Sequence, residues 1–351
     1  MDKIIFFAIL VLFPFGQLFK IGFVNLFDVS VLLLAVVTFL KKPKYPKWYR
    51  YFVYFLVAGF FGLLVNYSLF TIDSALYLVR LWSCSMVAVY VSNFVTDKRF
   101  VTKSLIVISV VGAVFGWLQY LIWPDLTALK YLGWDDHLLR MVGTFLDPTY
   151  LGLIFVLGII IAFQNNFNEV AYFLLLSLAF TYSRSSYLVA GLFLIFRRKY
   201  LAIFIFILAI LLLPKNIGEG TNLARTVSGS NKLINYEETF EIIKKSPVFG
   251  IGFNNICKAR KLYLNDTNPD SHACNGSDSS ILFVLATTGV VGFMLLLYAI
   301  SYMPYGIILK ASFFVVLLHS FFANSLFYPH IMFWLFVLVG LQTEVNNKGS
   351  S

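Results

Sequence analysis

The stretch from Thr102 to Trp123 reads TKSLIVISVVGAVFGWLQYLIW. Its only charged residue is Lys103, near its N-terminal end. A helix needs about 20 mainly apolar residues to cross the hydrocarbon core of a bilayer. This stretch therefore predicts a membrane-spanning helix, and runs of the same kind recur along the chain.

The composition of the whole chain agrees with a lipid environment. Of its 351 residues, 60% are hydrophobic and only 13% are charged. Soluble domains usually carry roughly a quarter charged residues. A soluble protein with this composition would expose large apolar patches and aggregate. We therefore exclude a soluble globular protein.

The apolar runs predict an all-α, polytopic protein of about twelve transmembrane helices. The expected spans are 3–19, 24–40, 50–66, 74–94, 102–123, 148–163, 169–183, 185–197, 200–214, 279–299, 303–321 and 327–342. Residues 1–214 would hold the first nine helices, and residues 279–342 the last three. Between them, residues 215–278 would form a long polar loop with short helices.

Basic residues predict the orientation of these spans. Lys and Arg are enriched in short cytoplasmic loops, and here they cluster at 41–50, 98–103 and 197–199. The predicted spans place all three clusters on one side. Both termini, with a tail at 343–351, would then be cytoplasmic, and the loop 215–278 extracytoplasmic. The net charge of +10 is explained by these clusters, so no nucleic-acid partner is expected.

Residues 169–197 are compatible with one long helix or with a hairpin. A single helix would place Ser183 and Arg184 at the bilayer centre, where an unpaired charge is costly. It would also move the basic cluster 197–199 to the outer side. We therefore predict a hairpin, with Arg184 in a tight turn at the outer surface.

The entry to the sixth predicted span, residues 140–152, reads RMVGTFLDPTYLG. Asp147 is expected to cap the helix that Pro148 opens. Arg140 would lie beside this helix N-terminus, which is a natural anion site. Alternatively, Arg140 reaches out to lipid headgroups.

Two further arginines are candidates for function. Arg184, in the predicted turn 181–186, carries a planar guanidinium that matches phosphate oxygens, or else contacts a headgroup. Arg80 lies about six residues inside a predicted span, so it should face a watery cavity or a structural ion-pair partner.

Asp278 stands at the start of the helix predicted at 279–299. Its carboxylate either caps that helix or faces an outer cavity and accepts a proton from a hydroxyl group. If Asp278 only caps the helix, Glu237 or Glu238 in the long loop would accept the proton from the hydroxyl group.

Cysteines and histidines in the outer segments offer little chemistry. Cys257 and Cys274 lie in one predicted extracytoplasmic loop, where a disulfide is permitted, but the sequence leaves their pairing open. His272 lies in the same loop, and His319 and His330 lie near the outer ends of the last two helices. Zinc needs a cluster of suitably spaced ligands, which these residues do not supply. No metal and no cofactor is expected.

Four short motifs stand in a fixed order in the outer segments. They are Arg140, Gly143, Phe145 and Pro148; Ser183 and Arg184; Pro247, Gly250 and Gly252; and Asp278, Leu282, Gly289 and Gly292. Together, over about residues 70–300, they resemble the O-antigen polymerase and ligase superfamily of bacterial envelopes.

This resemblance implies a GT-C-like, lipid-linked glycosyltransferase of the bacterial inner membrane, with its active site facing the periplasm. Such enzymes take a glycan from undecaprenyl pyrophosphate and pass it to a sugar hydroxyl. Ligases of the superfamily typically carry His where this chain has Asp278. That departure favours an O-antigen polymerase of the Wzy type, which extends O-antigen or capsule repeats.

Residue roles follow from the resemblance and from the charge that develops on the leaving pyrophosphate. Arg140 and Arg184 would hold the pyrophosphate, and Asp278 would activate the acceptor hydroxyl. The residues expected to bind substrate are Arg80, Glu237, Glu238, Arg260 and His272.

The expected partners are the undecaprenyl-pyrophosphate-linked oligosaccharide, membrane lipids and a chain-length regulator protein. One alternative is an O-antigen ligase that transfers glycan to lipid A-core. An alternative of another class is a flippase for lipid-linked oligosaccharides. Transporters usually show internal repeats, and the sequence shows none.

Overall fold

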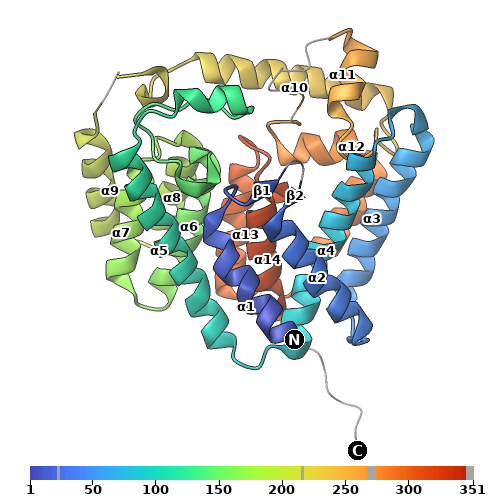
Figure 1. The fold of residues 1–351 in the computed structure, drawn as a ribbon, viewed down its shortest axis with the longest axis horizontal. Coiled ribbons are helices and arrows are strands. Elements are labelled where there is room, and N and C mark those ends of the chain that lie inside the picture. Colours follow the sequence, from blue (N-terminus) through green and yellow to red (C-terminus); the bar gives the residue numbers. More distant parts are fainter. Residues whose placement is uncertain (22–23, 215–216, 267–273, 275, 345–351) are drawn as a thin grey trace, which may run out of the picture.

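Helices make up nearly all of the regular structure, as predicted (Figure 1). This computed structural model describes residues 1–21, 24–214, 217–266, 274 and 276–344. Within these ranges the strands are β1 (Lys20–Ile21) and β2 (Val24–Asn25), which pair antiparallel in a short hairpin. Residues 345–351 of the predicted tail lie outside the described residues.

Each of the predicted spans overlaps one helix of the bundle, but the first helix ends at Leu12, before the predicted end at residue 19. The helices are α1 (Asp2–Leu12), α2 (Leu26–Leu40), α3 (Lys47–Val65), α4 (Ile72–Phe94), α5 (Lys98–Ile122), α6 (Pro148–Gln164), α7 (Asn168–Ala179), α8 (Arg184–Phe196), α9 (Tyr200–Leu212), α12 (Ser280–Ser301), α13 (Ile307–His319) and α14 (Pro329–Gln342). By length and composition, α3, α4, α5 and α12 can cross a membrane. The remaining apolar helices are shorter, so the full number of crossings stays a prediction.

The connecting segments contain shorter elements. They are η1 (Phe13–Phe15), η2 (Tyr67–Leu69), η3 (Thr127–Leu132), η4 (Gly143–Phe145), η5 (Glu219–Thr221), α10 (Val227–Lys245), α11 (Ile256–Leu264) and η7 (Ser325–Phe327). Helix α10 lies across one end of the bundle (Figure 1). We call this the loop end, because it also carries residues 123–147 and the segments on either side of α10.

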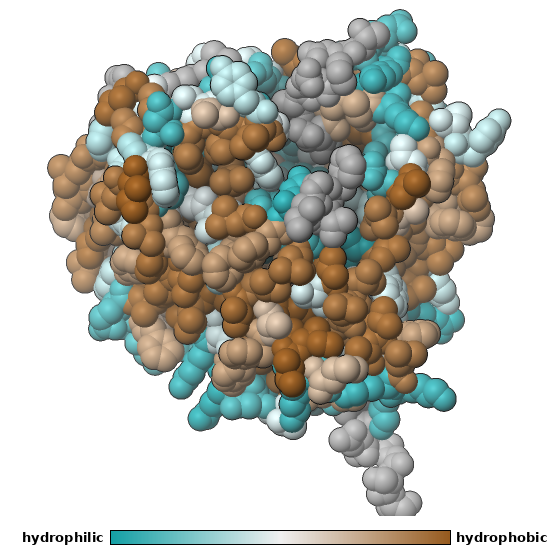
Figure 2. Space-filling view, in the orientation of Figure 1, coloured by the Kyte–Doolittle hydropathy of each residue, from teal (hydrophilic) through white to brown (hydrophobic). Residues whose placement is uncertain are grey.

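The opposite end carries basic residues, as the predicted orientation requires. Lys41, just after α2, forms a salt bridge of 2.8 Å with Asp2 at the start of α1. The same ammonium group lies 5.1 Å from the ring centroid of Phe94, at the end of α4. Figure 2 shows hydrophilic residues along this lower edge and a broad apolar belt above it. Which end faces the cytoplasm remains a prediction.

Two helices, α6 and α14, form the centre of the bundle. Nearly every residue of α6 from Leu151 to Phe163 is buried, and so is every residue of α14 from His330 to Leu341. Both are apolar around their whole circumference, and a helix of this kind is buried on all sides. In contrast, α9 exposes Leu201, Phe204 and Leu212, as expected of a helix that faces lipid.

The hairpin prediction for residues 169–197 is confirmed. Helix α7 ends at Ala179 and α8 begins at Arg184, with a turn between them. Tyr182 in this turn has a left-handed φ of 51°, and the side chain of Ser183 caps α8. The reversal therefore places Arg184 at the loop end.

Helix α12 is broken at Gly289, whose φ of 63° is not helical. The segment Pro247–Gly252 lies against this break. The N–H of Ile251 donates to the carbonyl of Ala286 at 2.8 Å, and the N–H of Val290 donates to the carbonyl of Pro247 at 2.9 Å. These bonds satisfy backbone groups that the break exposes, which is required in an apolar environment.

The third and fourth motif segments thus have a structural explanation. A Cβ on Gly289 would lie 2.2 Å from the carbonyl oxygen of Val248, and one on Gly250 would lie 2.4 Å from the backbone of Thr288. Only glycine permits such an approach of two backbones. The glycines therefore fix the direction of the first half of α12, which carries Asp278 near its start.

Candidate active site

Arg140 is buried at the loop end, between η3 and η4. It is 8% exposed, and its Nε donates a hydrogen bond of 3.1 Å to the carbonyl oxygen of Thr181. Beside it, the N–H of Met141 donates to the carbonyl of Phe180 at 2.8 Å. These two bonds join the segment 140–148 to the turn between α7 and α8.

The charge of Arg140 is not neutralised by a salt bridge with any residue in the described ranges. Burial lowers the pKa of Arg140 to about 10, and the positive charge of Arg225 acts in the same direction. The guanidinium still carries its proton at neutral pH. A buried cation is stabilised by a nearby anion. The burial of Arg140 therefore favours contact with an anionic ligand inside the protein over contact with lipid headgroups at its surface.

Arg184 is the first residue of α8 and is exposed. Its Nη1 donates a hydrogen bond of 2.7 Å to the carbonyl oxygen of Arg225. The side chain therefore lies against the segment 217–226, on the same side of the molecule as Arg140.

Arg225 is a third arginine at this place, and sequence reasoning missed it. Its Nη1 donates to the carbonyl oxygens of Gly220 at 2.8 Å and Asn222 at 3.1 Å. Arg140 packs against Gly220, where a Cβ would lie 2.6 Å from the Cδ of Arg140. We call Arg140, Arg184 and Arg225 the arginine cluster. No motif marks Arg225 in the sequence, because only the fold brings the loop back over the turn.

His137 lies next to the arginine cluster and was also missed. It is 7% exposed, and neither ring nitrogen has a hydrogen-bond partner among the described residues. Burial lowers the pKa of His137, and the charge of Arg140 lowers it further. The imidazole is therefore neutral at pH 7.

Asp147 caps α6, as predicted. Its Oδ1 accepts hydrogen bonds from the N–H of Thr149 at 2.6 Å and of Tyr150 at 3.3 Å. Pro148 occupies the first position of the helix, where its missing N–H costs nothing.

Asp278 does not cap the helix that follows, so the capping alternative is wrong. The N-cap residue of α12 is Ser279, and the N–H of Ser280 donates to the carbonyl of Ser320 at 2.9 Å. The side chain of Asp278 instead forms a salt bridge of 3.7 Å with Lys232 of α10. The carboxylate is thus presented toward α10 at the loop end.

Tyr236, also on α10, lies within electrostatic reach of Asp278. Burial raises the pKa of Tyr236 to about 12, and the charge of Asp278 contributes to the shift. Its hydroxyl donates to the carbonyl of Phe321. The phenol is therefore a neutral hydrogen-bonding group at pH 7.

His319 connects the turn of Arg184 with the start of α12. Its Nε2 lies 3.0 Å from the Oγ of Ser185 and 3.1 Å from the Oγ of Ser186, while its Nδ1 lies 2.6 Å from the Oγ of Ser325. The next residue, Ser320, accepts the hydrogen bond from the N–H at the start of α12. The elements that carry Arg140, Arg184 and Asp278 are thus joined at one end of the bundle.

Arg80 forms a salt bridge of 2.7 Å with Asp28 of α2. The structural ion pair that the sequence analysis considered for Arg80 is therefore present. Both residues also line a cavity of about 230 Å³. The other lining residues are Gln17, Lys20, Asn25, Phe27, Trp134, Pro329 and His330. Figure 2 shows a hydrophilic hollow above the apolar belt of this face.

The remaining candidates lie on α10 and α11. Arg260 is buried and forms salt bridges with Glu238 and, at 2.7 Å, with Asp266. Glu238 and Arg260 therefore hold α10 to α11. Glu237 is exposed on α10. His272 lies outside the described residues.

A disulfide between Cys257 and Cys274 closes the segment that follows α11, so the pairing that the sequence left open is formed. Among the described residues, no group of three or more His, Cys, Asp or Glu side chains could hold a metal ion.

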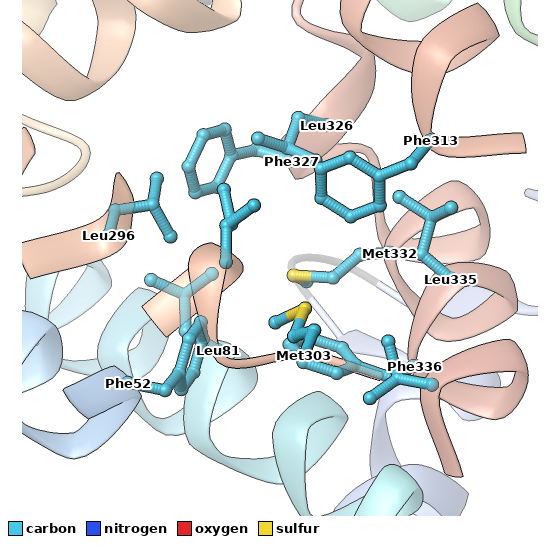
Figure 3. Close-up of a pocket in the computed structure, with 12 residues that line it drawn as sticks. Phe52, Leu81, Leu296, Met303, Phe313, Leu326, Phe327, Met332, Leu335 and Phe336 are labelled. Carbon is cyan, nitrogen blue, oxygen red and sulfur yellow. The ribbon is translucent and has the colours of Figure 1, made fainter. Parts of the chain in front are cut away.

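A second cavity, of about 40 Å³, lies in the middle of the bundle and is lined only by apolar side chains (Figure 3). The side chains come from α3, α4, α12, α13, η7 and α14 and from the segment after α12, and include Phe52, Leu81, Leu296, Phe313 and Met332. A cavity of this kind stays dry. It offers no group for polar chemistry.

Residues 150–297 match the Wzy_C family, which is described as O-antigen ligase. The matched segment starts in α6 and ends in α12, so it includes Arg184, Arg225 and Asp278. Members of this family are inner-membrane polymerases or ligases that act on lipid-linked glycans. No curated protein matches the chain.

Proposed function

Because residues 150–297 form a domain of the Wzy_C O-antigen ligase family, we propose that this chain polymerises undecaprenyl-pyrophosphate-linked oligosaccharide repeats. The reaction would take place at the outer face of the inner membrane. The observation that carries the proposal is the buried cation Arg140, which meets the turn of Arg184 at the loop end.

The leaving group of this reaction is a lipid-linked pyrophosphate. Negative charge grows on its oxygens as the anomeric carbon–oxygen bond breaks. Fixed cations in a site that excludes water stabilise such charge strongly. Arg140 is buried and protonated, Arg184 and Arg225 lie beside it, and a guanidinium offers paired donors to phosphate oxygens. We assign the arginine cluster to the pyrophosphate.

The second bond of the reaction joins the acceptor oxygen to the anomeric carbon. The acceptor hydroxyl must lose its proton as this bond forms, and a carboxylate within reach can take it. We assign this role to Asp278. Its salt bridge with Lys232 supports the assignment, because the pair holds the carboxylate at the loop end and away from the helix terminus.

The assignment as a polymerase, rather than a ligase, depends on residue 278. Ligases of this superfamily resemble one another in carrying His at the helix start, where this chain has Asp278. The description of the matched family as O-antigen ligase keeps ligation as the second candidate. Both reactions use the same donor, so the arginine cluster serves either one.

The direct test is an assay with purified full-length protein in nanodiscs and purified lipid-linked repeats, without lipid A-core. A polymerase forms a ladder of longer lipid-linked chains, seen by gel electrophoresis and mass spectrometry. A product that appears only when lipid A-core is added would establish a ligase instead. Transport of the unchanged repeats across a vesicle membrane, with no new bond, would establish a flippase.

The assay should include Arg140→Ala and a matched control, Arg99→Ala. Arg99 is an exposed arginine at the basic end, so it tests for general effects of removing a positive charge. We expect the ladder to be lost in Arg140→Ala and kept in Arg99→Ala. A normal ladder in Arg140→Ala would remove the pyrophosphate role of the arginine cluster.

A further inference from the structure

The cavity of about 230 Å³ beside the β1–β2 hairpin has no role in the steps above. It differs from the dry cavity of Figure 3, because charged, amide and aromatic side chains line it together. Its volume equals the liquid volume of about eight water molecules. The cavity therefore has room for one small polar molecule.

Two of the three charges in this cavity balance each other, and the third, on Lys20, lies over the ring of Trp134. Arg80 and Asp28 face each other at 2.7 Å, so a fixed carboxylate lies beside the half-buried guanidinium. An incoming phosphate would meet that carboxylate and be repelled. Arg140, by contrast, has no salt bridge among the described residues. The structure thus favours a neutral ligand in this cavity and the anion at the arginine cluster.

The cavity also offers hydrogen-bond donors and acceptors of several kinds. The amides of Gln17 and Asn25 line it with the charged pair. His330, which is 1% exposed, has both ring nitrogens without a partner among the described residues. Its ring stacks on Phe27 with centroids 4.3 Å apart. Both nitrogens expose almost no surface, so His330 contributes its aromatic ring to the wall of the cavity rather than a hydrogen bond to a ligand.

One wall of the cavity is aromatic. Trp134 is partly exposed, and the ammonium of Lys20 lies 5.1 Å from its ring centroid. An indole presents a broad apolar surface with a polar edge. A sugar ring has the matching character, since its C–H groups form an apolar face and its hydroxyl groups point outward.

The cavity adjoins the segment that carries Arg140. The N–H of Gln17 donates to the carbonyl of Thr144 at 2.9 Å, and the hydroxyl of Thr144 donates to the carbonyl of Pro14 at 2.6 Å. Thr144 lies between Arg140 and Asp147 in the first motif. A ligand in the cavity would therefore lie next to a ligand at the arginine cluster.

We propose that this cavity binds a sugar ring of the lipid-linked glycan, with Trp134 as its stacking platform. Gln17 and Lys20 supply hydrogen bonds to the hydroxyl groups. Arg80 supplies a further donor, and Asp28 supplies an acceptor. This inference rests on the proposed function and deepens it, because it places the glycan and the pyrophosphate in two adjoining sites.

Saturation-transfer NMR on the full-length protein in nanodiscs tests the proposal. The probes are glucose, galactose, mannose, rhamnose, N-acetylglucosamine and N-acetylgalactosamine, each alone. Inorganic pyrophosphate is followed separately by phosphorus line broadening. The variants are Trp134→Ala, Trp134→Tyr, which keeps an aromatic surface, and Trp123→Ala. Trp123 is 66% exposed and lies outside the cavity, so it is the matched control.

We expect at least one sugar to show saturation transfer in the wild type. Loss of the aromatic surface in Trp134→Ala should weaken that signal by about 2- to 10-fold. Trp134→Tyr should keep most of it, and Trp123→Ala all of it. Broadening of pyrophosphate should be the same in Trp134→Ala as in the wild type. The proposal is overturned if no sugar signal depends on Trp134, or if Trp134→Ala abolishes pyrophosphate broadening.

The outcome is separable from that of the proposed function. If lipid-linked repeats are not polymerised but a sugar signal depends on Trp134, sugar binding in the cavity is supported and the polymerase proposal fails. If a ladder forms with the same KM in Trp134→Ala as in the wild type, the polymerase stands and the cavity has no part in it.

Discussion

The Nε of Arg140 donates a hydrogen bond of 3.1 Å to the carbonyl oxygen of Thr181, a residue 41 positions away in the chain. This bond holds a buried guanidinium against the turn that carries Arg184. It also brings two motifs from separate helices together at the loop end. Within the described part of the chain its Nη atoms make no hydrogen bond, and they are the groups that we assign to the pyrophosphate.

Asp278→Asn should abolish turnover without loss of folded protein. Removal of a general base usually lowers a rate by about 10²- to 10⁴-fold, and we expect kcat to fall while KM changes little. The matched control is Asp147→Asn, because Asn caps a helix about as well as Asp. Equal activity in both variants would show that Asp278 is not the general base and that its role is limited to the salt bridge with Lys232.

Arg225→Ala tests the member of the arginine cluster that has no sequence motif. Its guanidinium also anchors the segment 217–226 through the carbonyls of Gly220 and Asn222. A hydrogen bond to a charged group contributes about 1.5–3 kcal/mol, so activity should fall by roughly 10- to 100-fold. Arg225→Lys should recover part of this loss. Wild-type activity in Arg225→Ala would limit the cluster to Arg140 and Arg184.

Gly289→Ala should destabilise the protein, because residue 289 has a φ of 63° and a Cβ there would lie 2.2 Å from the carbonyl oxygen of Val248. A positive φ with an extended ψ is essentially confined to glycine and costs another residue about 1–3 kcal/mol, and the backbone contact adds to this cost. A lower midpoint of thermal unfolding in detergent would show this.

The control for that variant is Gly191→Ala, within α8. A Cβ at Gly191 meets no atom within 4 Å. Replacing a helical glycine by alanine usually stabilises by up to about 1 kcal/mol. If the two variants unfold at the same temperature, the break in α12 is not held by the segment Pro247–Gly252.

His137 predicts a pH dependence of stability. Its pKa in the folded protein lies below the ordinary value of 6.5, so the unfolded chain binds a proton more readily. Its contribution to stability is therefore complete above pH 6.5 and declines as the pH falls toward the folded-state pKa. The thermal midpoint of the wild type should drop between pH 7.5 and pH 5, and His137→Gln should show a smaller drop. If the thermal midpoints of the wild type and of His137→Gln fall equally with pH, His137 is not the source of the pH dependence.

Hydropathy was sufficient to predict the helices, and the reason is physical. In lipid every backbone polar group must be satisfied inside the protein, and a helix does this within one segment, so an apolar run of sufficient length becomes a helix. The argument from basic residues also resolved the hairpin of α7 and α8 correctly. The capping role of Asp147 followed from Pro148 beside it, because both preferences are local.

The site was less predictable, because it depends on contacts between distant segments. Nothing local shows that Arg80 pairs with Asp28, 52 positions away. Arg225 reaches the cluster only because the long loop folds back over the turn. The capping role considered for Asp278 was wrong by one residue, since the backbone of α12 starts from a hydrogen bond to Ser320. The glycines were identified by motif, but only the break in α12 explains them.

The most direct test of the account is the affinity of the purified protein for undecaprenyl pyrophosphate, measured by native mass spectrometry in nanodiscs. A charge-assisted contact contributes about 1.5–3 kcal/mol, so Arg140→Ala should bind the lipid roughly 10- to 100-fold more weakly than the wild type. Arg99→Ala should bind as the wild type does. An unchanged affinity in Arg140→Ala would contradict the claim that the arginine cluster holds the pyrophosphate.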